Sequence, residues 1–272
     1  MLRRLTVTSG RVCWPVLKND RSGSRMKAPK QRLDLVLVSQ GLAATRERAR
    51  AMIMAGTVLV GGVRVDKPGT SVRLEDEIVV KGGDHPWVSR GGLKLAHALQ
   101  SFEIDVGGRV ALDIGASTGG FTDVLLQNGA ARVYAVDVGH GQLDWGLRND
   151  ARVVTLERTN ARNLTGEQVP DPVDAVVCDA SFIGLRTVLP AGLRLAAPGA
   201  VLVALIKPQF EAGRDRVGKG GVVRDPMVHQ EVCETIQCWL ESQPNWRVLG
   251  LTESPVRGPA GNIEFLIAAQ HD

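Results

Sequence analysis

Five apolar runs in the second half of the chain alternate with helical or loop segments. They read RVALDIG from Arg109 onward, then RVYAVDVG, RVVTLERTN, DAVVCDASF and AVLVALIKPQF. Strands that alternate with helices pair as a mostly parallel sheet, whose ligand lies beyond the carboxyl ends of the strands. The pattern therefore predicts an α/β fold of the doubly wound, Rossmann-like type.

Length and charge distribution predict two domains. The chain has 272 residues, which exceeds the roughly 100–200 typical of one domain. Residues 1–84 hold 16 Lys/Arg against 8 Asp/Glu and the remainder holds 17 against 21, so the net charges are +8 and −4. We expect the basic front to bind a polyanion, because counterion release favours contacts with phosphates.

Composition and cysteine spacing exclude several other classes of protein. A hydrophobic content of 44% with 23% charged residues is ordinary for globular proteins, which excludes disordered, collagen-like and coiled-coil chains. The longest uncharged stretches, 51–63 and 195–206, are shorter than the about 18–20 apolar residues of a membrane span. The four cysteines form no CxxC pair and have no histidine at zinc-ligand spacing. We therefore expect no disulfide framework, no metal site and a reducing, cytoplasmic location.

The first 30 residues are basic and show no hydrophobic periodicity. They hold eight Lys/Arg and a single acid, Asp20. We expect residues 1–30 to form a disordered basic tail. An Arg-rich transit peptide, and a native start at Met26 instead of Met1, are alternatives that the sequence leaves open.

Residues 31–82 have the pattern of a small α+β domain. Apolar residues recur at helical spacing over 33–37 and 49–53, and alternating segments around 58–60, 63–65 and 78–80 predict short strands. The segment resembles the S4-type RNA-binding module in its RLD opening, its TR…A…I…G helix, its VLVGGVRVDKPG hairpin and its DEIVV strand. Gly61 stands where that family usually has Asn, and glycine also tolerates the positive φ of such a turn. The resemblance implies binding to structured RNA, with phosphate contacts from Arg32, Arg46, Arg50 and Lys67.

A Gly-Gly pair and the sequence Asp84-His85-Pro86-Trp87 mark a joint. Pro86 lacks a backbone donor and favours extended geometry in the residue before it. We therefore expect a stiff linker over 83–92 and a second domain over 93–272.

The loop after the first apolar run is glycine-rich. Its glycines at 115, 119 and 120 do not fit the GxGxxG spacing of dinucleotide folds, which argues against a nicotinamide-dependent dehydrogenase. Asp137 follows the second run at a position where a carboxylate can bind ribose hydroxyls, although acids that merely end strands are an alternative interpretation.

LDIGASTGGF followed by AVDVG resembles the first two motifs of class I S-adenosylmethionine-dependent methyltransferases. The resemblance implies S-adenosyl-L-methionine as the cofactor, with Asp137 at its ribose and Asn160 of RTNARN near its adenine. It also implies cofactor contacts from the strand end and loop, at Asp113, Gly115, Ala116, Ser117, Thr118 and Gly119.

Several acceptors of a methyl group can be compared. Amino-group methylation often uses Asn/Asp-Pro-Pro-aromatic, whereas this chain reads Asp179-Ala-Ser-Phe. Cytosine C5 chemistry would want a cysteine after proline, whereas Cys178 follows Val177 in an apolar run. A ribose hydroxyl is a much weaker acid than either competing group. Its methylation therefore calls for a base that removes the proton and for stabilisation of the forming alkoxide. Two lysines and two acids suit this task.

The candidates for that task are Lys94, Asp179, Lys207 and Glu264, although each taken singly could be a surface charge. Together they resemble the Lys-Asp-Lys-Glu tetrad of the FtsJ-like 2′-O-ribose methyltransferases. With the S4 module, the WVSRGG joint, ERTNAR, LIKPQFE and GPAGNIEF, the chain is similar to the TlyA family from Arg32 to about Ala268.

The TlyA resemblance implies a cytidine 2′-O-methyltransferase that acts on the ribosomal RNA of small and large subunits. Lys207 would be the general base, and the other three members of the tetrad would position the ribose and tune charge. His85 replaces an Arg that is frequent in the joint of the family, and Ala260 replaces a Ser that is frequent in its last glycine-rich motif. These two departures bear on cofactor affinity and on one hydroxyl contact. A non-enzymatic RNA-binding or assembly factor, and a haemolysin as the family was historically labelled, are the competing hypotheses.

Overall fold

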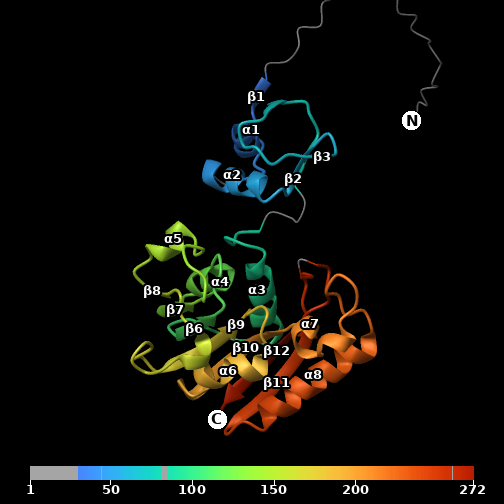
Figure 1. Cartoon of the computed structure of the whole chain (residues 1–272). Coiled ribbons are helices and arrows are strands. Elements are labelled where there is room, and N and C mark those ends of the chain that lie inside the picture. Colours follow the sequence, from blue (N-terminus) through green and yellow to red (C-terminus); the bar gives the residue numbers. More distant parts are fainter. Residues whose placement is uncertain (1–29, 44, 81–84, 259) are drawn as a thin grey trace, which may run out of the picture. The chain divides into compact units, whose positions relative to one another are not determined.

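The computed structural model describes residues 30–43, 45–80, 85–258 and 260–272. The chain divides into two compact units, Met1–Asp84 and His85–Asp272 (Figure 1). The predicted basic tail lies outside the described residues apart from Lys30, and so do residues 83 and 84 of the predicted linker.

The first unit is a small α+β domain. Its elements are β1 (Lys30–Arg32), α1 (Leu33–Ser39), α2 (Arg46–Met54), β2 (Val58–Val60), β3 (Val63–Arg64), β4 (Ser71–Arg73) and β5 (Ile78–Val80). Strands β1 and β4 form one antiparallel pair, and β3-β2-β5 form an antiparallel sheet. The apolar residues predicted to share helix faces, among them Leu33, Val36, Ala49 and Ile53, are fully buried in one core. Burial of these stripes supplies the stability that such short helices lack alone.

The second unit contains a seven-stranded sheet. Its strands are β6 (Val110–Ile114), β7 (Arg132–Val136), β8 (Val153–Leu156), β9 (Val173–Cys178), β10 (Ala196–Ile206), β11 (Trp246–Glu253) and β12 (Phe265–His271). Its helices are α3 (Gly91–Ser101), α4 (Gly120–Gln127), α5 (Trp145–Arg148), α6 (Leu185–Leu193), α7 (Pro208–Glu211) and α8 (Pro226–Glu241), with 3₁₀ turns η1 (Ala161–Asn163) and η2 (Arg214–Arg216).

The strand order is β11-β12-β10-β9-β6-β7-β8. Neighbours from β10 to β8 pair in parallel, whereas β12 runs antiparallel to both β10 and β11. Successive residues of β6 face two separate cores: Ala111 packs with α3 and α4, and Leu112 packs with α6 and α8. The mostly parallel, doubly wound sheet predicted from the apolar runs is therefore confirmed.

The register of the sheet brings its loops together. Ile114 at the end of β6 pairs with Val136 of β7 and with Cys178 of β9. The segments that leave these strands therefore emerge side by side at one edge, where ligands of such sheets bind.

Candidate active site

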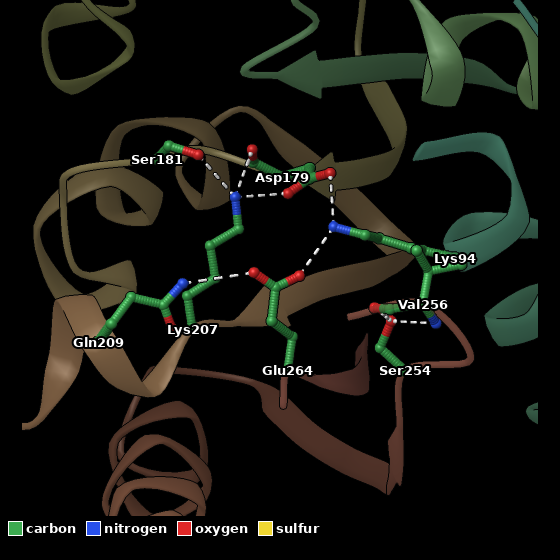
Figure 2. A network of polar contacts seen from close by, with 8 residues as sticks. All are labelled: Lys94, Asp179, Ser181, Lys207, Gln209, Ser254, Val256 and Glu264. Atoms are coloured by element: carbon green, nitrogen blue, oxygen red, sulfur yellow. Dashed lines mark hydrogen bonds and ion pairs between the residues drawn. The ribbon is translucent and has the colours of Figure 1, made fainter. Parts of the chain in front are cut away.

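Four charged side chains from different elements meet in one cluster at this edge (Figure 2). Lys94 comes from α3, Asp179 follows β9, Lys207 follows β10, and Glu264 precedes β12. Nζ of Lys94 lies 2.8 Å from Oε2 of Glu264 and 3.4 Å from Oδ2 of Asp179. Lys94, Lys207 and Glu264 are buried, with 8%, 6% and 2% of their surface exposed. The surface-charge interpretation is therefore wrong for these three residues; we call the four residues the charged cluster.

Three oxygen atoms surround Nζ of Lys207. Ser181 Oγ accepts a hydrogen bond from it at 2.8 Å, and the main-chain carbonyl of Asp179 accepts another at 3.2 Å. Oδ1 of Asp179 lies 2.6 Å away as an ion-pair partner, without hydrogen-bond geometry. The Asp179 carboxylate therefore lies between two lysine nitrogens, one at each oxygen.

Two further residues of this site were not predicted from the sequence. Ser181 contacts Lys207, and Gln209 Nε2 donates to Oε1 of Glu264 at 3.4 Å. Both stand inside the quoted motifs DASF and LIKPQF, which is the only signal that pointed to them.

A cavity of about 540 Å³ opens onto the charged cluster, and we call it the cluster cavity. All four members of the cluster line it, together with Ser89, Arg90, Phe182 and Arg257. Arg90 and Arg257 are exposed at its wall. Phe182 is 91% exposed, and the centre of its ring lies 5.2 Å from that of Phe210.

A second cavity of about 690 Å³, the loop cavity, adjoins the first. Asp137, Asn160, Gln142, Thr159 and Arg162 line it, with Val188 and other apolar residues. The two cavities share five wall residues: Gly115, Ser117, Asp179, Ser181 and Phe182. The charged cluster thus borders both spaces through Asp179.

Gly115 is where the main chain bends between the cavities. Its φ is +83°, and a Cβ there would lie 2.9 Å from the main chain of Ala180. A larger residue would therefore be strained and would collide with the strand-end loop that carries Asp179. At Gly115 the wall therefore consists of main-chain atoms, with no side chain projecting into the cavities.

Local hydrogen bonds hold Asp137 and Asn160 at the wall of the loop cavity. The Asp137 carboxylate accepts main-chain hydrogen bonds from Ser117 at 2.8 Å and Gly139 at 2.7 Å. The side-chain oxygen of Asn160 accepts from Arg162 N at 3.1 Å and so begins η1. Asp137 thereby fixes the glycine-rich loop while its side chain faces the cavity.

The other residues predicted for cofactor binding are placed differently. Ala116 and Thr118 line the cluster cavity only. Asp113 and Gly119 line neither cavity: Asp113 is fully buried, and a Cβ on Gly119 would lie 2.3 Å from Leu147. Both residues therefore lie behind the cavity walls, in positions that support the glycine-rich loop.

Asp113 is a buried carboxyl group. Thr122 Oγ1 donates to its Oδ2 at 2.7 Å, and its Oδ1 has no hydrogen-bond partner among the described residues. Burial raises the pKa of Asp113 to about 7, with a smaller contribution from the charge of Asp179. The neighbouring Cys178 is a fully buried core thiol, and this burial raises its pKa to about 12.

The first unit presents a separate basic site around a buried acid. Arg32 donates two hydrogen bonds to Asp34, each 2.9 Å long, and Arg46 Nε donates to the same carboxylate at 3.0 Å. The Arg32 hydrogen bonds lower the pKa of the buried Asp34 to about 2. Arg50 and Lys67 are exposed and have no side-chain partner within the described part of the chain. The sequence did not predict a role for Asp34, although it belongs to the RLD opening.

The comparisons with known proteins match both units. The FtsJ-like methyltransferase model matches residues 87–271, and the S4 domain model matches residues 31–78. The 16S/23S rRNA (cytidine-2′-O)-methyltransferase TlyA of Mycobacterium tuberculosis is 49% identical over 88% of this chain and 90% of its own length. Hemolysin A of Brachyspira hyodysenteriae is 41% identical over 86% of this chain and 98% of its own.

The solved structure of a protein named as a hemolysin from Streptococcus thermophilus is similar, with a TM-score of 0.69 and 44% identity over 90% of each chain. No helix in the described ranges is long and apolar enough to cross a bilayer. Both domain models match in the order that the sequence motifs predicted, and the matches to full-length relatives extend across the joint. The chain therefore belongs to the TlyA family, in which an S4 domain precedes an FtsJ-like methyltransferase domain.

Proposed function

We propose that this methyltransferase transfers a methyl group from S-adenosylmethionine to the 2′-hydroxyl of cytidine in the ribosomal RNA of small and large subunits. The observation that carries the proposal is the charged cluster, which lies where the loop cavity and the cluster cavity meet. The activity in the name of the M. tuberculosis relative supports the same substrate. A ribosomal substrate implies a cytoplasmic enzyme.

The loop cavity fits the proposed cofactor. Its volume of about 690 Å³ lies within the range of small-molecule sites, and its wall combines apolar residues with a few polar groups. Asp137 would hold the ribose hydroxyls and Asn160 would lie near the adenine, while Gly115 and Ser117 would offer main-chain contacts. When bound, S-adenosylmethionine supplies an electrophilic methyl group on a sulfonium centre.

Loop residues without access to the loop cavity have a supporting role in this proposal. Asp113 and Gly119 hold the glycine-rich loop in place from beneath, and Ala116 and Thr118 shape the wall of the neighbouring cluster cavity.

The charged cluster would manage the proton of the ribose hydroxyl. Lys207 receives that proton at Nζ, and Asp179 stabilises the ammonium that forms, from 2.6 Å. Lys94 and Glu264 hold the other oxygen of Asp179 in place, since Nζ of Lys94 bridges the two carboxylates. Proton transfer to a positioned base contributes about 10²–10⁴-fold to the rate of such reactions.

The RNA would be held by both units. Residues 31–82 would bind structured RNA through Arg32, Arg46, Arg50 and Lys67, and residues 93–272 would carry out methyl transfer. The exposed ring of Phe182, at the wall of both cavities, offers a face on which a base can stack. Residues 83–92 would link the two.

The test is transfer of labelled methyl from S-adenosylmethionine to purified small and large ribosomal subunits that lack the modification. Nuclease digestion and mass spectrometry of the nucleosides identify the product. Labelled 2′-O-methylcytidine is the expected result. A labelled base would contradict the role of the charged cluster, and tight binding to RNA without any label would favour a non-enzymatic assembly factor.

A further inference from the structure

Nζ of Lys207 is enclosed by its partners. Its side chain is only 8% exposed, and three oxygen atoms, from Asp179 and Ser181, lie within 3.2 Å of the nitrogen (Figure 2). An ammonium group has three N–H bonds, so these three oxygens match its donors in number. The site is thus well arranged to stabilise Lys207 after it has taken up a proton, but a substrate must reach it through one of the enclosing groups.

Ser181 is the accessible member of that enclosure. It is exposed, and it lines both the cluster cavity and the loop cavity. The Asp179 carbonyl carries no proton, and the Asp179 carboxylate is engaged by both lysines. A serine hydroxyl can donate one hydrogen bond and accept others at the same time.

We propose that Ser181 relays the proton of the ribose 2′-hydroxyl to Lys207. This inference rests on the proposed function and adds a residue to its chemistry. The hydroxyl of the bound nucleoside donates to Ser181 Oγ, while the proton of Ser181 points to the lone pair of a neutral Lys207 Nζ. The contact of 2.8 Å between Oγ and Nζ is within hydrogen-bond range for such a transfer.

The proton balance of the step is closed within the site. The ribose O–H bond breaks, and its electron pair stays on the oxygen that bonds to the methyl group. Ser181 Oγ takes that proton and passes its own to Nζ of Lys207. Ser181 ends as a neutral hydroxyl and Lys207 ends as an ammonium beside Asp179, from which solvent removes the proton before the next turnover.

The experiment compares two variants of equal size, Ser181→Thr and Ser181→Val, in the full-length protein. They differ in that threonine keeps a hydroxyl where valine has a methyl group, and that methyl group occupies the place of the hydroxyl. Rates are measured in single turnovers on unmodified ribosomal subunits with saturating S-adenosylmethionine. Ser101→Ala, on the last turn of α3 and outside both cavities, is the control expected to retain the wild-type rate.

We expect Ser181→Val to lose about 100-fold in the single-turnover rate, the lower end of general acid–base effects. Ser181→Thr should stay within about tenfold of the wild type, since it keeps a hydroxyl on Nζ. The two variants should bind S-adenosylmethionine and RNA with equal affinity, because threonine and valine have the same shape at the wall that Ser181 lines. A Val variant as fast as the Thr variant would overturn the relay.

A second measurement requires no turnover. The ¹⁵N resonance of Lys207 Nζ is recorded in the ligand-free protein at a pH low enough to keep the amine protonated, and it is assigned by its loss in Lys207→Ala. Ser181→Val should shift this resonance and speed exchange of its protons with water, because one of three acceptors is gone, whereas Ser181→Thr should leave both near the wild-type values. An unshifted resonance in Ser181→Val would show that the hydroxyl does not hold Nζ.

The outcomes separate this inference from the proposed function. If the wild-type protein labels no ribose, the proposed function fails whatever the variants do. If the wild type forms 2′-O-methylcytidine and Ser181→Val does so equally fast, only the relay fails, and direct transfer to Lys207 or Asp179 replaces it.

Discussion

Nζ of Lys94 lies 2.8 Å from Oε2 of Glu264, although the two residues are 170 positions apart in the chain. Both are buried, and the same lysine nitrogen also contacts Asp179. Removal of one partner from a buried ion pair leaves an uncompensated charge and costs about 3–5 kcal/mol.

The ion pair between Lys94 and Glu264 gives the first prediction. Lys94→Met should lower the free energy of unfolding by about 3 kcal/mol, because Glu264 and Asp179 lose their shared cation. The double variant Lys94→Met/Glu264→Gln should regain most of that stability, because the buried carboxylate of Glu264 is replaced by a neutral amide. It should stay inactive. Chemical denaturation and methyl-transfer assays measure the two properties separately. Equal stability of the single and double variants would contradict this prediction.

Lys207→Ala should reduce methyl transfer by at least about 100-fold, since the proposed proton acceptor is gone. Cofactor affinity should change by only severalfold, because Lys207 lines the cluster cavity and not the loop cavity. Calorimetric titration with S-adenosylmethionine measures the cofactor affinity, and a labelled-methyl assay measures the rate of transfer. Normal turnover in this variant would refute the assignment of the base.

Asp137→Ala should weaken binding of S-adenosylmethionine by about tenfold or more, equivalent to about 1.4 kcal/mol. The variant loses the proposed ribose contact and also the hydrogen bonds that hold Ser117 and Gly139. Asp150→Ala is a matched control, because that acid also accepts a local main-chain hydrogen bond but lines neither cavity. Undiminished affinity in Asp137→Ala would count against a cofactor role for the loop cavity.

Charge reversal should separate Arg46 from Arg50 in the RNA-binding unit. Arg50→Glu should weaken RNA binding and reduce the slope of log affinity against log salt by about 1, with little change in stability. Arg46→Glu should do the same and also destabilise the first unit, because the buried Asp34 loses a hydrogen bond and faces a like charge. Filter binding to a ribosomal RNA fragment at several salt concentrations gives the slopes. An unchanged slope in both variants would show that helix α2 does not face RNA.

The buried Asp113 should make stability fall as pH rises. Its pKa is raised from 3.8 in the unfolded chain to about 7 in the folded state, chiefly by burial. The folded state therefore holds a proton between about pH 4 and pH 7 that the unfolded state releases, so the free energy of unfolding decreases across that window and levels off above it. In the wild type this decrease in the free energy of unfolding should amount to a few kcal/mol, and Asp113→Asn should abolish it. Denaturation in urea between pH 4 and pH 8 measures the change. A wild-type slope in the variant would assign the effect to other groups.

The fold could be predicted from the sequence because its signals are local. Apolar runs and helical periodicity each extend over about ten residues, and the parallel sheet follows from their alternation. The four members of the charged cluster were predicted from family motifs. Their mutual distances were not, because they depend on the register of β6, β9, β10 and β12.

The predictions that could not be made concern contacts between elements. Ser181 and Gln209 acquire their roles from Lys207 and Glu264, which lie on other loops. Asp34 has no local feature that separates it from an exposed acid, and hydrogen bonds from Arg32 and from Arg46 on the next helix compensate its burial. Asp113 and Gly119 belong to the glycine-rich motif, but the path of the main chain turns them away from both cavities.

The five residues shared by the two cavities have a consequence for inhibition. A compound that joins a nucleoside to a cofactor analogue would occupy both spaces at once, and its linker would pass Gly115 and Asp179 at the common wall. A substitution in that wall that excluded the compound would also disturb the site of methyl transfer. Resistance to such a bisubstrate ligand would therefore be costly for the enzyme.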